Sequence, residues 1–180
     1  MEGLKPEDVV YGDQMGCTLN CQPTHALAPI GERAKGTVKG RRGKNQSTMS
    51  VIGMKGVLVS RTIEGAFNGL LVLDLIQELC RKLKRGQVLV LDNARIHKKY
   101  QEEMRAELGK VGCRLVYLPP YSPQMNPIEM TWSKVKALVR KDRPQERLTL
   151  VGAIHWALKK VRKSDITGWY SKAHLQAHLT

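Results

Sequence analysis

Two aspartates stand directly after apolar segments that have the composition of β-strands. Asp92 follows the aliphatic run of residues 88–91, which is typical of a strand covered on both faces, and Asp13 follows a shorter apolar segment at residues 9–11. Ligands of open α/β sheets bind at the carboxyl ends of the strands, so these carboxylates converge if the two strands are neighbours. Adjacent carboxylates repel each other unless a cation neutralises them, and oxygen ligands suit Mg²⁺ or Mn²⁺. The pair therefore indicates a metal site, although a lone Asp more commonly starts a turn after a strand.

A third acid, Glu129, stands at the start of a helix that we expect over residues 127–140, with Asn126 as its N-cap. Two interpretations of Glu129 are open. Its side chain can turn back to the amide of Asn126 and close a capping box, or it can be a third metal ligand. Lys136 and Arg140 share the side of the helix that carries Glu129. Cations in this position suit a bound phosphate backbone, and they equally suit a solvated helix face.

The elements that must position these acids alternate along the chain. We expect strands at residues 9–11, 18–21, 49–54, 57–62, 88–91 and 114–118, and helices at residues 70–83, 98–108, 127–140, 148–161 and from residue 164 onward. The proline-rich stretch at residues 119–123 forms a stiff loop before the third acid. This order predicts an α/β fold, a mixed sheet flanked by helices with a helical C-terminus. A chain of 180 residues fits one such domain, so we assign residues 1–180 to a single unit.

The charge of the chain favours a polyanionic partner. Thirty Lys and Arg against sixteen Asp and Glu give a formal net charge of +14 and an isoelectric point near 9.9. Such an excess of cations favours nucleic acid, since phosphate contacts release condensed counterions, over a basic protein with no such partner. No apolar run approaches the length of a membrane span, and the first thirteen residues contain no apolar signal core. We therefore expect a cytoplasmic protein with no membrane partner.

A basic, glycine-containing insertion at about residues 22–48 interrupts the strand pattern. Six cations fall within twelve of its residues, with no acid among them: Arg33, Lys35, Lys39, Arg41, Arg42 and Lys44. We interpret it as a loop that follows the DNA backbone and orders on binding, and the alternative is a solvated charged linker. Cys17, Cys21 and His25 near its start suggest zinc, but they lack a fourth ligand and match no common zinc spacing. Thiols packed beside a strand are the better interpretation.

Three segments in order resemble the transposases of the mariner superfamily, and their bacterial insertion-sequence branch most closely. The first is VLDNARIHK at residues 90–98, the second is YLPPYSPQMNPIE at residues 117–129, and the third is WSKVK at residues 132–136. Weaker matches are APIGER at residues 28–33, the hairpin at residues 50–65, and Asn68-Gly69. A long ordered string of this kind is far more specific than a single motif.

The resemblance implies a ribonuclease-H-like fold and an Asp-Asp-Glu metal site. Asp92 matches the second acid of the family and Glu129 the third. Asp13 matches the first acid, and Gln14 stands where the family usually has Glu. The implied chemistry uses two Mg²⁺ or Mn²⁺ ions for phosphodiester hydrolysis and strand transfer during DNA transposition. The implied partners are double-stranded DNA, both transposon ends and target, with the protein acting as a homodimer on DNA and taking no small-molecule substrate.

Several expectations follow for the surroundings of the site and for the chain. His97 and Lys98 lie near Asp92 in sequence, so we expect both to contact phosphates, with a surface or capping role as the alternative for His97. Full-length relatives carry helix-turn-helix modules upstream, so we expect this chain to be a frameshift partner or a decayed copy, located at the bacterial nucleoid. The competing function is a catalytically inactive DNA-binding remnant. A resolvase of similar fold is disfavoured by the proline-rich string that leads to Glu129.

Overall fold

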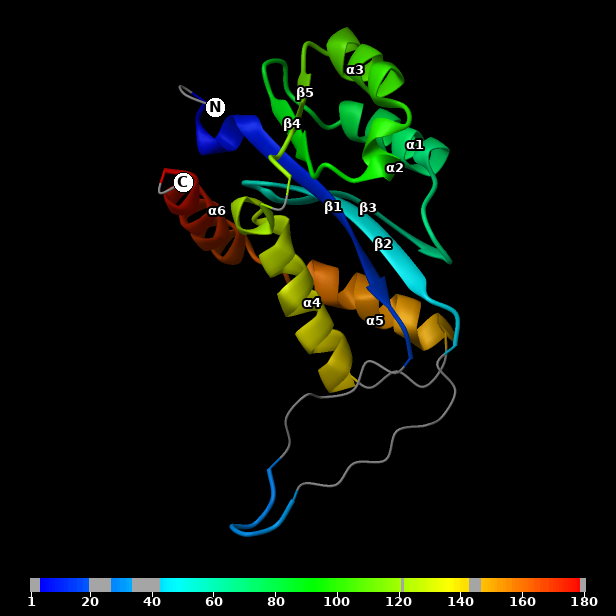
Figure 1. The fold of residues 1–180 in the computed structure, drawn as a ribbon, viewed down its shortest axis with the longest axis vertical. Helices are drawn as coiled ribbons and strands as arrows, with labels where there is room; N and C mark the ends of the chain where they lie inside the picture. Colours follow the sequence, from blue (N-terminus) through cyan, green and yellow to red (C-terminus); the bar gives the residue numbers. More distant parts are fainter. Residues whose placement is uncertain (1–3, 20–26, 34–42, 121, 143–146, 179–180) are drawn as a thin grey trace.

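The computed structural model describes residues 4–19, 27–33, 43–120, 122–142 and 147–178. Across these residues the strands form one mixed sheet with the order β3-β2-β1-β4-β5 (Figure 1). β1 is antiparallel to β2 and parallel to β4, β2 is antiparallel to β3, and β4 is parallel to β5. The strands are β1 (Val9–Cys17), β2 (Gln46–Gly53), β3 (Gly56–Glu64), β4 (Val88–Leu91) and β5 (Arg114–Tyr117). The α/β architecture with a mixed sheet is thus confirmed.

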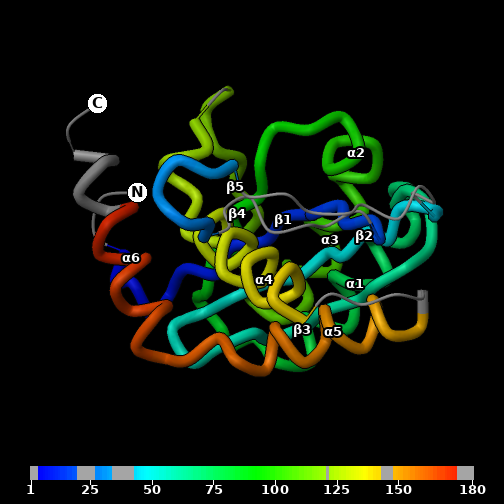
Figure 2. The backbone as a smooth tube through the Cα atoms, turned by 90° about the horizontal axis from the view of Figure 1, so that it is seen from below, coloured from blue at the N-terminus to red at the C-terminus, as the bar shows by residue number. Residues whose placement is uncertain are grey.

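Helices cover both faces of this sheet (Figures 1 and 2). On one face lie α1 (Gly69–Cys80), α2 (Arg95–Lys98) and α3 (Gln101–Lys110), and on the other lie α4 (Ile128–Asp142), α5 (Arg147–Lys159) and α6 (Lys163–His178). Short 3-10 turns precede β1 and α4, namely η1 (Pro6–Asp8) and η2 (Pro123–Met125). The last helix is tied to the sheet, because the hydroxyl of Tyr170 donates to the carbonyls of Val9 and Ile52.

The aliphatic run in β4 is buried on both sides. Leu89 and Leu91 pack into the core under α1 and α3, whereas Val88 and Val90 pack with Val9 on the opposite face. All four residues of β4 are fully buried, which is why this strand lacks the polar alternation of a half-exposed strand. The carboxyl end of β4 is therefore a fixed point in the core, and the residue that follows it is held in place.

Three expected elements are corrected by the structure. β1 does not stop at residue 11 but continues to Cys17, because its second half pairs with β2. The helix expected at residues 98–108 is two helices, α2 and α3, with a break at Tyr100. Of the strand expected at residues 18–21, residues 18 and 19 are not in a strand, and residues 20 and 21 lie outside the described part of the chain. Asp13 is consequently inside a strand and does not end one.

The hairpin, the strands at residues 88–91 and 114–118, and the helices around residues 70–83, 127–140 and 148–161 are confirmed, with boundaries moved by a few residues. Residues 27–33, in the expected insertion, lie apart from the sheet, at the bottom of Figure 1, with Leu27 and Ile30 fully exposed. No helix in the described part of the chain has the length and apolar content needed to cross a membrane.

Candidate active site

The register of the sheet brings Asp13 and Asp92 next to each other. The parallel pairing of β1 with β4 ends at the pair Gly12–Leu91. Asp13 is the next residue of β1, and Asp92 is the first residue after β4. Gly12 permits this approach, since a Cβ atom on it would lie 2.7 Å from the side chain of Leu91. Beyond this pair β1 continues beside β2 alone, while the chain leaves the sheet after β4. Asp13 and Asp92 therefore occupy adjacent backbone positions at the carboxyl end of β4.

Asp13 points to the face of the sheet that α4 covers. Its side chain is buried, and its Oδ2 atom accepts a hydrogen bond of 3.0 Å from the indole nitrogen of Trp132 on α4. The pKa of Asp13 is raised to about 6, mainly by burial and further by the negative charges of Glu129 and Asp92. Glu129 and Asp92 are thus close enough to Asp13 for their charges to raise its pKa.

Asp92 has a different environment. Its side chain is 44% exposed, and its Oδ1 atom lies 2.5 Å from Nδ1 of His97 and 3.1 Å from the amide nitrogen of Ala94. The hydrogen bond from His97 is the main reason why the pKa of Asp92 is lowered. At neutral pH Asp92 is therefore ionised and held by two donors at one of its oxygens.

Glu129 starts α4, and the helix cap does not use its side chain. Asn126 caps the helix through Oδ1, which accepts from the amide of Ile128. The amide of Asn126, which a capping box would pair with Glu129, donates instead to the carbonyl of Pro123 in η2. The capping-box interpretation is therefore wrong, and the exposed Glu129 side chain is available to the cleft in front of it.

A cleft of about 340 Å³ lies between the segment after β4 and the start of α4. Asp92 and Glu129 both line it, and the proline-rich loop forms its opposite wall. The full lining consists of Asp92, Asn93, Ala94, Leu118, Pro119, Pro120, Ser122, Pro123, Asn126 and Glu129. The Oδ1 atom of Asn93 is buried and has no hydrogen-bond partner among the described residues. The cleft thus offers two carboxylates to a ligand.

The donor set fits a hard divalent cation. Asp13, Asp92 and Glu129 supply only carboxylate oxygens, which Mg²⁺ and Mn²⁺ prefer, and their mutual repulsion is what a cation would relieve. Within the described residues, no group of three His, Cys, Asp or Glu side chains is already gathered closely enough to hold an ion. Binding would therefore have to draw the carboxylates closer together than they lie here.

The placement of His97 differs from the expectation. Its side chain is 1% exposed, and its two ring nitrogens lie within hydrogen-bonding distance of Asp92 and of the Gln14 amide. The hydroxyl of Tyr117 also donates to the carbonyl of His97 at 2.6 Å. Because the ring is buried with both nitrogens engaged, the expectation that His97 contacts a phosphate is wrong.

The cations named in the sequence lie in several places. Lys98 is exposed, with its Nζ atom 5.9 Å from the ring centre of Tyr117, and Lys136 and Arg140 are partly exposed on α4. Lys44 forms an ion pair of 2.8 Å with Glu64, and Arg33 is exposed in the separate segment of residues 27–33. Four other expected DNA contacts lie outside the described residues, namely Lys35, Lys39, Arg41 and Arg42. Cys21 and His25 of the discarded zinc hypothesis also lie outside them.

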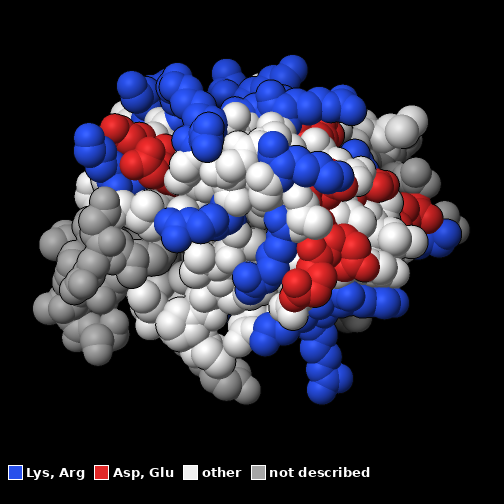
Figure 3. Space-filling view, turned by 90° about the horizontal axis from the view of Figure 1, so that it is seen from above, with Lys and Arg blue, Asp and Glu red and all other residues white. Residues whose placement is uncertain are grey.

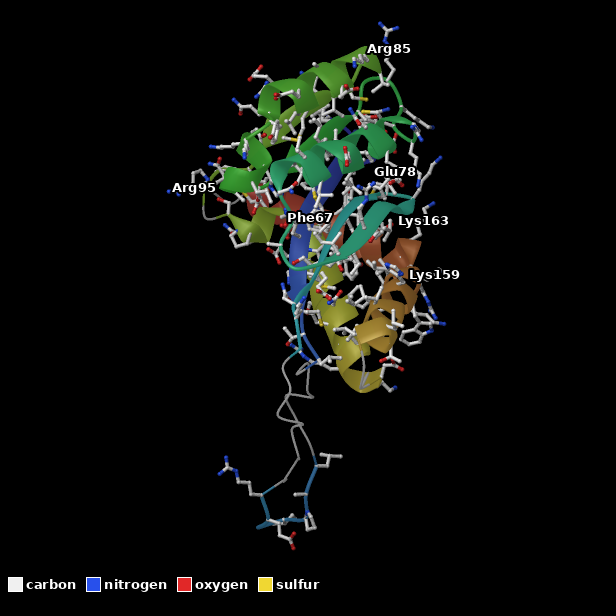
Figure 4. All side chains as sticks on the ribbon, turned by 90° about the vertical axis from the view of Figure 1, so that its right-hand side faces the viewer. Phe67, Glu78, Arg85, Arg95, Lys159 and Lys163 are labelled. Carbon is white, nitrogen blue, oxygen red and sulfur yellow. The ribbon has the colours of Figure 1, made fainter. Side chains whose placement is uncertain are left out.

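Positive charge is spread widely over the molecule. Figure 3 shows Lys and Arg side chains over the upper end of the fold, between smaller groups of Asp and Glu. Arg95, the first residue of α2, projects on the opposite side of the molecule from Lys159 and Lys163 of the C-terminal helices (Figure 4). The excess of cations is therefore not confined to the insertion.

Two residues of the site were not identified as functional from the sequence. Trp132 appeared only as the first residue of the WSKVK segment, with no role assigned, yet its indole N–H donates to Asp13. The available signal was that a buried indole N–H requires an acceptor. Gln14 was noted only as a departure from the family pattern, and its partner His97 lies 83 residues away in the sequence. No local pattern connects these two residues.

Comparisons with known proteins bear on the family and the fold of this chain. The model of one protein family, described as DDE superfamily endonuclease, matches residues 8–151. No curated protein matches the chain. Solved structures do match: the Mos1 strand transfer complex has 17% identity and a TM-score of 0.71, with 94% of this chain and 51% of that chain covered. The Mos1 paired-end complex with the left transposon end has 16% identity and a TM-score of 0.71, with 94% and 52% covered.

The catalytic domain of Mos1 mariner transposase also matches, with 14% identity, a TM-score of 0.62, and 93% of this chain and 76% of that chain covered. These likenesses show the fold, which is ribonuclease-H-like. The chain spans about half the length of the Mos1 chains in the two complexes. Mos1 structures have been solved with Mg and with Mn.

Proposed function

This chain belongs to the DDE superfamily of endonucleases, and we propose that it is the catalytic domain of a DNA transposase that hydrolyses phosphodiester bonds and transfers strands at transposon ends. The observation that carries the proposal is the position of the acids. Asp13 and Asp92 directly follow Gly12 and Leu91, the last residue pair of the parallel β1–β4 pairing. Glu129 lines the cleft that Asp92 also lines. Three carboxylates at the carboxyl end of a central strand form the donor set that divalent-metal phosphoryl chemistry needs.

In this proposal Asp13, Asp92 and Glu129 hold two Mg²⁺ or Mn²⁺ ions. When bound there, divalent ions lower the pKa of a water molecule and stabilise the charge that develops on the scissile phosphate. The chain's own residues orient the ligands. Trp132 fixes Asp13 through its indole N–H. The stiff proline-rich loop keeps the opposite wall of the cleft in place.

We further propose double-stranded DNA, both transposon ends and target, as the partner. The solved Mos1 structures include a strand transfer complex and a paired-end complex with the left transposon end, and the net charge of +14 gives this chain the electrostatics that DNA requires. Lys98, Lys136, Arg140 and the basic insertion are the proposed phosphate contacts. Homodimeric action on DNA and location at the nucleoid are parts of the same proposal, as is the assignment of residues 1–180 to one domain.

The experiment that tests the function is metal-dependent nicking of a supercoiled plasmid that carries the ends of the element. The chain is assayed with Mn²⁺ or Mg²⁺. Asp92→Asn is compared with Glu103→Gln, which removes an exposed acid on α3. We expect nicking that Asp92→Asn abolishes and Glu103→Gln leaves intact. Salt-sensitive DNA binding without nicking would instead establish an inactive DNA-binding remnant.

A further inference from the structure

A buried histidine connects β1, which carries Asp13, with Asp92, the residue that follows β4. The ring of His97 lies between Asp92, which follows β4, and Gln14, which follows Asp13 in β1. Successive residues of a strand point to opposite faces of the sheet, so Asp13 faces α4 while Gln14 faces α2. His97 therefore contacts one acid directly and the sequence neighbour of the other.

The hydrogen bonds define the tautomer of the ring. The amide nitrogen of Gln14, 3.0 Å from Nε2 of His97, can only donate, so Nε2 accepts. The proton of the neutral ring is then on Nδ1, which donates to Oδ1 of Asp92 at 2.5 Å. The amide of Ala94 donates to the same oxygen. Among the described residues nothing donates to Oδ2, so one oxygen of Asp92 is held and the other is open.

The ring is also fixed through its backbone. α2 has four residues, too few for a helix to hold its own position, and the hydroxyl of Tyr117 on β5 donates to the carbonyl of His97. Three strands of the sheet thus determine where the imidazole lies: β1 through Gln14, β4 through Asp92 and β5 through Tyr117. A ring that is 1% exposed and anchored in this way cannot swing out to a bound DNA strand.

We propose that His97 is a positioning residue for Asp92: it holds Oδ1 and leaves Oδ2 directed to the cation. The proposal rests on the proposed function, because it assumes that Asp92 is a metal ligand. Partners that orient a ligand through hydrogen bonds commonly change metal affinity about 10–100-fold when they are removed. Gln14 supports the arrangement from behind, since it keeps Nε2 as the acceptor and Nδ1 as the donor.

A matched pair of variants tests this role. In His97→Asn the amide nitrogen lies where Nδ1 was and keeps the donor to Asp92. In His97→Gln the amide lies where Nε2 was, so its oxygen can accept from Gln14 and the donor to Asp92 is lost. Both variants remove the ring and one buried hydrogen bond, so we expect similar losses of thermal stability. We measure Mn²⁺ affinity by calorimetry without DNA, and kcat and KM for nicking. His97→Asn should stay within about threefold of the wild type, and His97→Gln should bind Mn²⁺ about 10–100-fold more weakly and lose kcat with little change in KM.

Gln14→Ala is the third variant, and it serves if His97→Gln does not fold. It leaves the contact with Asp92 in place but removes the support of the ring, so Mn²⁺ affinity should fall by a smaller factor, about three- to tenfold. Equal Mn²⁺ affinity in wild type, His97→Gln and Gln14→Ala would overturn the positioning role while leaving the proposed function intact. Absence of Mn²⁺ binding and of nicking in the wild type would overturn the proposed function and this role with it.

Discussion

The indole N–H of Trp132 on α4 donates to the carboxylate of Asp13 on β1, across 119 residues of sequence. Trp132 stands one helical turn after Glu129, so the same helix carries a proposed metal ligand and the donor that fixes another. The packing of α4 against the sheet therefore positions two of the three acids, Asp13 and Glu129. The apolar side of α4, with Ile128, Val135 and Val139 fully buried, determines that docking.

Replacement of Trp132 by Phe tests this connection. Phe keeps the aromatic packing but removes the N–H, and it leaves the Asp13 carboxylate in a buried position without its side-chain donor. We expect the free energy of unfolding to fall by about 1–3 kcal/mol at pH 7.5, measured by urea denaturation. Trp169→Phe on α6 is the control, since Trp169 is partly buried and is not in contact with an acid of the site. Equal losses in the two variants would show that the hydrogen bond contributes nothing specific.

Asp13→Asn should stabilise the fold at neutral pH. Burial and the neighbouring acids raise the pKa of Asp13 from 3.8 to about 6, so the folded state disfavours the ionised form. The penalty is fully present above pH 6 and absent below pH 3.8, because stability falls with pH where the folded state binds more protons than the unfolded state. Asn removes the charge and can still accept from Trp132. We expect a gain of up to about 3 kcal/mol at pH 7.5, which disappears towards pH 4.

Urea denaturation of both proteins at pH 7.5, 6 and 4 measures this gain. Glu103→Gln, an exposed acid on α3, is the control and should change the free energy of unfolding little at any of these values. A gain from Asp13→Asn that is the same at pH 4 as at pH 7.5 would contradict the assignment of the raised pKa to Asp13.

Divalent cations should stabilise the wild type and not the variants that lack a ligand. A ligand that binds only the folded state raises the free energy of unfolding, by about 2.7 kcal/mol at a concentration 100 times Kd. We expect Mn²⁺ to raise the Tm of the wild type, with full reversal by EDTA, and to have little effect on Asp13→Asn, Asp92→Asn or Glu129→Gln. A Tm increase that persists in all three variants would place the ion elsewhere on the protein.

Local sequence pattern was sufficient to predict some features of the fold and of the candidate site, but not others. The aliphatic run of β4 and the apolar stripe of α4 are set by burial, which the periodicity of the sequence records. The length of β1 is not local, because strand pairing with β2 keeps residues 13–17 extended. The burial of His97 depends on Gln14 from another strand, and the unused capping box of Glu129 depends on η2, which takes the amide of Asn126. For β1 and His97 a contact distant in sequence decided between two locally acceptable arrangements, whereas for Glu129 the deciding contact lies only three residues before Asn126.

The cations of α4 should contribute to DNA affinity through phosphates. Lys136 and Arg140 follow Glu129 on the same helix and are partly exposed, so a strand whose phosphate reaches the acids would pass them. Each phosphate contact contributes about 0.9 to the slope of log K against log salt for duplex DNA. We expect the double change Lys136→Gln and Arg140→Gln to weaken duplex binding for all sequences and to reduce the slope by about two, measured by fluorescence anisotropy from low to moderate salt.

Lys55→Gln, an exposed cation in the turn between β2 and β3, is the control and should leave the slope unchanged. Because these contacts are electrostatic, the difference in DNA affinity between the double variant and the wild type should shrink as salt rises. A difference in affinity that is constant with salt would show that the two side chains act through the packing of α4 and not through contacts with DNA.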